Sequence, residues 1–125
     1  MKRALRILSI LIGVMSFATA MRFAFTPASA AERLGMPLLQ GAAASTQLGD
    51  IGAFFIVLTL LIGAGQMHGQ SHLLHIAALL VATAAVMRTL VWLVGPADFA
   101  AQFISVELIS AAVLFGAAHV RGHET

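Results

Sequence analysis

Cysteine and tyrosine are both absent from the 125-residue sequence, and the lack of cysteine excludes disulfides, thiolate metal sites and cysteine nucleophiles. Charge is also scarce: 10% of the residues are Asp, Glu, Lys or Arg, whereas about a quarter is usual in a soluble domain. Hydrophobic residues make up 60% of the chain. So few charged side chains cannot cover a water-exposed surface, and we therefore expect the chain to lie in a lipid bilayer.

Basic residues are in slight excess, with seven Lys and Arg against five acids. No basic run extends beyond Lys2, Arg3 and Arg6, whereas a nucleic-acid surface needs a patch or stripe of cations. Nucleic acid is therefore excluded as a partner. Trp92 is the single tryptophan, so the aromatic belt that marks the membrane boundary is barely developed.

Four apolar stretches follow one another along the chain. Each approaches the roughly 20 residues that a helix needs to cross about 30 Å of hydrocarbon. Backbone groups must be paired inside lipid, which favours helices over an open sheet. The predicted spans are approximately residues 5–25, 48–65, 73–94 and 99–118. They form one all-α domain over residues 1–125, an integral membrane four-helix bundle in up-down-up-down order.

The first apolar stretch has a second interpretation as a secretory signal. It has a basic start and an apolar core, and Ala28-Ser29-Ala30 forms an A-x-A cleavage site. Arg22 would lie late in the apolar core of such a signal. We therefore expect the stretch to be retained as an uncleaved first span.

Two of the connecting segments contain turn and helix-boundary signals. In the first loop, Pro27 near the start and Gly35 at the stop predict a short interfacial helix over residues 28–34. In the last loop, Pro96 and Asp98 suit a tight turn followed by a helix start.

The basic residues near the chain ends predict the orientation. Lys2, Arg3 and Arg6 precede the first span, and Arg121 follows the last. Lys and Arg concentrate on the cytoplasmic side of spans. The expected protein is a multi-pass protein of the cytoplasmic membrane with both termini in the cytoplasm.

Each predicted span contains one ionisable residue: Arg22, Asp50, Arg88 and Glu107. In the expected topology all four lie roughly 3 to 12 Å from the outer ends of their spans, at 1.5 Å per residue. Four unpaired charges at such depths would cost on the order of 5–10 kcal/mol. We therefore expect Arg22 to pair with Asp50 and Arg88 with Glu107. Either these pairs only fix the register of the helices, or the four residues line an outward-facing polar pocket for a lipophilic ligand.

The histidines are spaced at helical intervals on the predicted cytoplasmic side. His68, His72 and His75 follow one another at i, i+4 and i+7, and His119 and His123 at i and i+4. Such spacing places side chains on one helix face and resembles a metal-binding pair. His72, His75 and His119 are the candidate ligands. The favoured interpretation is that the histidines lie at the headgroup boundary in place of Lys and Arg, with no metal or other cofactor.

Several short motifs together resemble a known group of proteins. They are the runs Pro27–Pro37 and Gly49–Phe55, with Arg88 in the third span and Glu107 in the fourth. In these features the chain resembles small, uncharacterised bacterial four-helix membrane proteins that are similar to the DoxX-like group. The resemblance implies a compact four-helix bundle in the bacterial inner membrane. It also mildly suggests an accessory subunit of a redox or transport complex.

Three functions are compatible with the four charged residues. The leading hypothesis is a small membrane protein that binds a lipophilic small molecule, or a partner helix, at the charged cluster. The second is an acid–base enzyme of the isomerase type, in which Glu107 or Asp50 transfers a proton and Arg88 or Arg22 holds an oxyanion. The third is the accessory subunit, within a homo-oligomer or a larger membrane complex. An enclosed cavity of about 300 Å³ or more at Glu107 would favour binding or catalysis.

Overall fold

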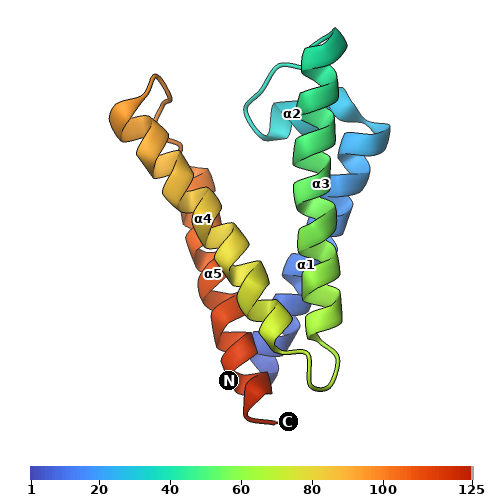
Figure 1. The fold of residues 1–125 in the computed structure, drawn as a ribbon, viewed down its shortest axis with the longest axis vertical. Coiled ribbons are helices and arrows are strands. Elements are labelled where there is room, and N and C mark those ends of the chain that lie inside the picture. The colour runs from blue at the N-terminus through green and yellow to red at the C-terminus, as the bar shows by residue number, and fades with distance from the viewer. Residues whose placement is uncertain (125) are drawn as a thin grey trace. The chain divides into compact units, whose positions relative to one another are not determined.

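The structure is a computed structural model, and it describes residues 1–124. Within this range the chain is all-α, with four long helices and one short one (Figure 1). The helices are α1 (Lys2–Phe25), α2 (Pro27–Arg33), α3 (Gly41–Gly65), α4 (His72–Val94) and α5 (Ala101–Gly122). All four long helices are long and apolar enough to cross a membrane. The predicted all-α fold and multi-pass membrane character are confirmed.

Two helix boundaries differ from the prediction. α3 begins at Gly41 rather than near residue 48, where the predicted span began. The helix extends further toward the N-terminus because Ala42, Ala43 and Ala44 favour a helix. α5 begins at Ala101, and its N-cap is Ala100 with no side-chain capping hydrogen bond. Asp98 therefore does not cap this helix.

The short helix in the first loop is confirmed, and its ends are explained by the sequence. Pro27 opens α2, where its missing N–H removes no helix hydrogen bond. At the other end Gly35 adopts a left-handed φ of 76°. The N–H of Gly35 donates to the carbonyl of Glu32, and that of Met36 donates to the carbonyl of Ala31, both at 2.9 Å. This is the Schellman pattern, which satisfies the last carbonyls of a helix. The location of α2 at the membrane interface remains a prediction.

The chain divides into two compact units. Residues 1–10 and 61–124 make up the first, which we call the α4–α5 unit. Residues 11–60 make up the second, which we call the α2 unit. Each candidate site described below lies within one of these units, and the two units are described separately.

In the α4–α5 unit, α4 and α5 lie side by side and run antiparallel (Figure 1). The ring of His75, early in α4, is 5.8 Å from that of Phe115, late in α5. At the other end the ring of Trp92 is 4.5 Å from that of Phe99. Antiparallel neighbours are what the up-down-up-down order requires of this pair; the order of the whole chain remains a prediction.

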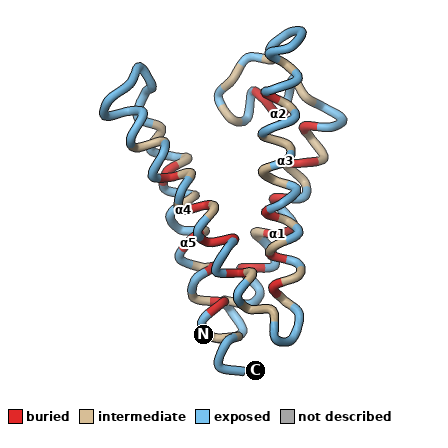
Figure 2. Tube along the Cα trace, in the orientation of Figure 1, coloured by how far each residue is buried: buried red, intermediate tan, exposed pale blue. Residues whose placement is uncertain are grey.

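Buried positions recur along both of these helices (Figure 2). They are Leu74, Ala77, Ala78, Val81 and Ala85 on α4, and Ile104, Ala111, Leu114, Ala117 and Ala118 on α5. Most are alanine, which lets the two backbones approach closely where lipid provides no hydrophobic drive between helices. The tight α4–α5 contact is what holds side chains from the two helices in a fixed relation.

In the α2 unit, aromatic packing joins α1 and α3. The rings of Phe23 and Phe55 stack with centroids 6.4 Å apart. Gly52 lies against Phe23, since a Cβ added to it would be 4.0 Å from the Cβ of Phe23. α2 contributes two buried alanines, Ala30 and Ala31. Phe23, Gly52 and Phe55 thus define which faces of α1 and α3 meet.

Candidate functional site

Arg88 on α4 and Glu107 on α5 form an ion pair within the α4–α5 unit. Arg88 Nε donates to Glu107 Oε1 at 2.7 Å. The guanidinium carbon of Arg88 also lies 4.9 Å from the centre of the Phe103 ring. Phe103 precedes Glu107 by one helical turn, so α5 supplies both an anion and an aromatic face to the same cation. The predicted pairing of Arg88 with Glu107 is confirmed.

The pair is only partly satisfied. Glu107 Oε2 is buried and has no hydrogen-bond partner among the described residues. The contact of Arg88 uses Nε alone, whereas a bidentate pair would also engage an Nη group. Side-chain exposure is 35% for Arg88 and 17% for Glu107. The site therefore offers guanidinium donors on the more open side and an acceptor oxygen on the buried side.

Arg22 and Asp50 do not form the expected second pair. Arg22 is half-buried in the last turn of α1, and Asp50 is exposed on α3. No salt bridge joins them within residues 1–124. Arg22 precedes Phe23 by one residue and Asp50 precedes Gly52 by two, and each residue turns a helix by about 100°. Arg22 therefore lies about 100° around α1 from Phe23, and Asp50 about 200° around α3 from Gly52. The contact between Phe23 and Gly52 does not bring the two charged side chains together.

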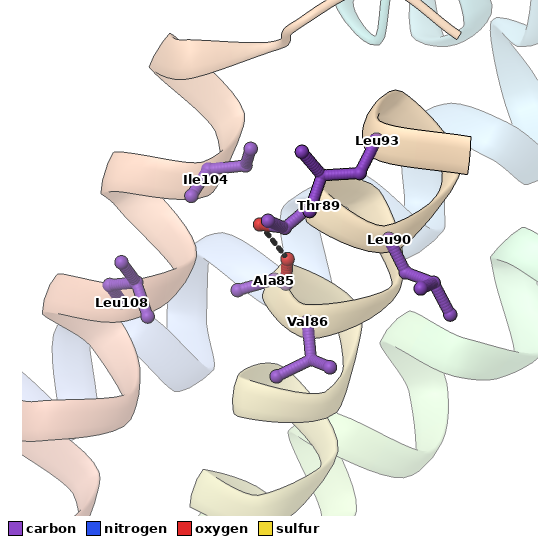
Figure 3. A pocket seen from close by; sticks show the side chains of 7 residues that line it. All are labelled: Ala85, Val86, Thr89, Leu90, Leu93, Ile104 and Leu108. Carbon is purple, nitrogen blue, oxygen red and sulfur yellow. Dashed lines mark hydrogen bonds between the residues drawn. The ribbon is translucent and has the colours of Figure 1, made fainter. Parts of the chain in front are cut away.

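An open apolar groove runs along the surface of α4 and α5 (Figure 3). It has a volume of about 310 Å³ and is lined by Ala85, Val86, Thr89, Leu90, Leu93, Ile104 and Leu108. The Thr89 hydroxyl donates to the carbonyl of Ala85 at 2.9 Å, so it is already satisfied (Figure 3). Neither Arg88 nor Glu107 lines this groove. The groove is therefore not the enclosed cavity at Glu107 that would favour binding or catalysis. It is an apolar surface suited to a hydrocarbon chain or an apolar side chain, separate from the ion pair.

The candidate metal ligands are not brought together. Across residues 1–124 no group of three or more His, Asp or Glu side chains has a geometry that would hold a metal ion. His75 packs against Phe115, and His119 instead meets His123, with their Nε2 atoms 3.2 Å apart. The i, i+4 spacing therefore produces a contact between His119 in the last turn of α5 and the C-cap residue His123, rather than a site shared with His72 and His75 on α4.

A polar cluster that was not predicted from the sequence joins α1, the residue that follows α3, and the end of α5 within the α4–α5 unit. Gln66, just after α3, donates through Nε2 to the hydroxyl of Ser9 on α1 at 3.0 Å. That hydroxyl donates to the carbonyl of Arg6 at 2.8 Å. Arg121 on α5 donates through Nη2 to the carbonyl of Gln66. One signal was available: a serine within a span needs a partner in lipid.

Gln47 is a second buried polar residue that sequence reasoning missed. It is 6% exposed on α3 and holds the chain that follows α2. Its Oε1 accepts from the N–H of Leu39 at 3.0 Å, and its Nε2 donates to the carbonyl of Pro37 at 2.9 Å. A glutamine at the edge of a predicted span gives no indication from sequence of which loop it will bind.

No family model, curated protein or solved structure significantly matches this chain. The chemistry of the site therefore rests on its own geometry. Arg88 can donate to an oxygen of a ligand, and Glu107 can accept a hydrogen bond or a proton through Oε2.

Proposed function

We propose that this membrane protein binds a lipophilic molecule through one polar head group at the Arg88–Glu107 pair. The observation that carries the proposal is the buried Oε2 of Glu107, which has no hydrogen-bond partner among residues 1–124 and lies beside the partly exposed side chain of Arg88. A buried acceptor without a donor costs about 1–3 kcal/mol, and more when it is charged. Once the Glu107 side chain turns Oε2 toward the surface, a ligand hydroxyl would supply the missing donor and offer its own oxygen to Arg88.

The surroundings of the pair suit a largely apolar ligand. Both residues lie within helices long and apolar enough to span a membrane. Phe103 presents its ring to Arg88, and Val106 and Ile109 are large exposed apolar residues that flank Glu107. In such a low-dielectric setting each hydrogen bond to the head group is stronger than in water. The head group would fix the orientation of the ligand, and its tail would lie along apolar helix surfaces.

A partner helix is the second candidate occupant, and the groove along α4 and α5 favours it. A Ser, Thr or Asn side chain of another membrane subunit carries the same donor and acceptor as a ligand hydroxyl. Leu90, Leu93 and Leu108 would then receive apolar side chains of that helix. This is the accessory-subunit role in a redox or transport complex, which the DoxX-like resemblance also suggests.

An acid–base enzyme remains the alternative that uses the same pair for chemistry. Glu107 is the better placed proton acceptor, because its Oε2 is buried without a hydrogen-bond partner among residues 1–124, whereas Asp50 is exposed on α3. We further propose the inner membrane of a bacterium as the location, with both termini cytoplasmic. Lys2, Arg3 and Arg121 near the chain ends support that orientation.

The test is to identify the molecules that accompany the protein when it is extracted from its own membrane. Wild type, Glu107→Gln and the matched control Asp50→Asn would be purified in parallel and their extracts compared by liquid chromatography and mass spectrometry. We expect one lipophilic molecule to accompany wild type and Asp50→Asn. Loss of a hydrogen bond to a charged group is worth about 1.5–3 kcal/mol, so Glu107→Gln should retain at least about tenfold less.

Two other results would change the conclusion. The same set of molecules in all three samples would overturn ligand binding at the pair. A second protein that accompanies wild type and is lost with Glu107→Gln would instead support the partner helix. Each variant must first be shown to remain folded in detergent, because an unfolded variant would lose any ligand.

A further inference from the structure

A basic pocket lies where the start of α1 meets the end of α5, within the α4–α5 unit. It has a volume of about 270 Å³. Its lining consists of Lys2, Arg3, Arg6, Ala117, Val120, Arg121 and Glu124. Close packing brings the two helix ends together, since a Cβ added to Gly116 would be 3.2 Å from Cδ2 of Leu5.

Positive charge in this pocket is largely unpaired. Four of its lining residues are basic and one, Glu124, is acidic. None of them takes part in a salt bridge within the part of the chain that the structure describes. The pocket therefore concentrates cations with room for an anion between them.

Arg121 provides a second, independent indication of a ligand. Its Nη2 donates to the carbonyl of Gln66, which fixes the guanidinium in place. Its Nε is buried and has no hydrogen-bond partner among residues 1–124. A buried guanidinium donor is rarely left without an acceptor. An anionic oxygen in the pocket would supply one.

The orientation rule for membrane proteins does not by itself account for this arrangement. It explains why Lys and Arg occur near the cytoplasmic end of a span. It does not require residues from opposite ends of the chain to surround one pocket. The convergence of Arg3 and Arg6 with Arg121 is a property of the fold.

We propose that this pocket binds the phosphate group of an anionic lipid. Guanidinium groups match phosphate geometry, and basic pockets between spanning helices are a known form of lipid head-group site. A lipid is favoured over free phosphate because apolar surface continues from the pocket. Ile7 and Ile10 are exposed on α1. Ile7 follows Arg3 by four residues and Ile10 follows Arg6 by four, spacings that place them along the same helix face. Acyl chains would follow that face while the phosphate lies among the cations.

The lipid site is separate from the proposed ligand site. Arg121 follows Glu107 by 14 residues on α5, a separation of roughly 20 Å at 1.5 Å per residue. A failure of one proposal therefore leaves the other standing. Glu107→Gln should not alter lipid retention at the basic pocket.

The experiment uses the full chain reconstituted in phosphatidylcholine, with or without phosphatidylglycerol, and counts retained lipids by native mass spectrometry. Arg6→Gln is the test variant because the Arg6 side chain is exposed and forms no hydrogen bond or salt bridge within residues 1–124. Arg33→Gln is the control, since it removes the same charge from α2. Arg121 is left unchanged because it also supports the fold.

We expect wild type to retain phosphatidylglycerol in preference to phosphatidylcholine. One basic residue near an anionic lipid is worth about 1 kcal/mol, so Arg6→Gln should weaken retention about fivefold. Arg33→Gln should leave it unchanged. No preference for phosphatidylglycerol, or equal retention by both variants, would overturn the proposal.

A second arm separates the two sources of phosphate. Inorganic phosphate is titrated against the protein in phosphatidylcholine alone, and the melting temperature is followed. No stabilisation is expected, because the acyl chains supply part of the binding. Stabilisation that Arg6→Gln abolishes would assign the pocket to free phosphate and overturn its assignment to lipid.

Discussion

The stability losses from removing Arg88 and Glu107 one at a time should add up to more than the loss from removing both together. Glu107→Gln leaves Arg88 unpaired within a span, where an Arg costs about 2.5–3.5 kcal/mol at the centre. Because the Arg88 side chain is 35% exposed, we expect a smaller loss in the free energy of unfolding, about 2 kcal/mol. Arg88→Gln leaves a carboxylate that is only 17% exposed, and it should cost about 3 kcal/mol.

The double variant measures the interaction itself. In Arg88→Gln with Glu107→Gln no charge remains unpaired, so its loss should fall short of the sum of the single losses. Polar interactions in membrane proteins average about 0.6 kcal/mol and reach about 1.7. An ion pair with Nε and Oε1 at 2.7 Å belongs at the upper end, and we expect a coupling of about 1–2 kcal/mol.

Reversible unfolding in mixed micelles, with increasing fractions of sodium dodecyl sulfate, provides the free energies. The chain offers a matched control cycle at Arg22 and Asp50, which have similar predicted depths but form no salt bridge within residues 1–124. That cycle should give a coupling within about 0.5 kcal/mol of zero. A coupling at Arg88 and Glu107 no larger than the control value would refute this reasoning.

Two further predictions concern packing and a buried amide. Gly65→Ala should lower the free energy of unfolding by about 1–3 kcal/mol, because the new Cβ would lie 2.6 Å from Leu74 Cγ and 3.1 Å from its backbone nitrogen. Gly63→Ala meets nothing within 4 Å and should be neutral or stabilising by up to about 1 kcal/mol in the same micelle titration; a larger loss at Gly63 than at Gly65 would contradict the packing. Gln47→Ala should speed hydrogen exchange at the Leu39 amide, since that N–H loses its acceptor, and unchanged exchange there would show that the contact does not hold the loop.

The sequence was sufficient for the features that depend on local pattern. Apolar length predicted the four spanning helices, and Pro27 with Gly35 predicted α2. The free-energy cost of an unpaired charge in lipid correctly predicted the ion pair between Arg88 and Glu107. The spanning helices and the ion pair each follow from one large free-energy cost, that of unpaired backbone groups or of unpaired charges in hydrocarbon. Few structures avoid that cost, so the sequence predicts them well.

Features that depend on the direction of a side chain around its helix were not predictable. Similar depth predicted a pair between Arg22 and Asp50, but no salt bridge joins them within residues 1–124, where Phe23 and Phe55 form the contact between α1 and α3. Gln47 gave no indication of its loop partners, and the convergence of Arg121 with the start of α1 requires the tertiary fold. Each of these contacts joins segments whose sequences do not show that they will meet.

The most direct test of the central claim is a solid-state NMR measurement on the protein in lipid bilayers. Dipolar coupling would be recorded between the guanidinium nitrogens of Arg88 and the carboxyl carbon of Glu107, with Glu107→Gln identifying the signal. The structure predicts a strong coupling to Nε, which lies 2.7 Å from Oε1, and weaker couplings to the Nη nitrogens. Absence of the Nε coupling would show that the pair does not form. Strong coupling to Nε and an Nη together would show a closed bidentate pair with no acceptor left for a ligand.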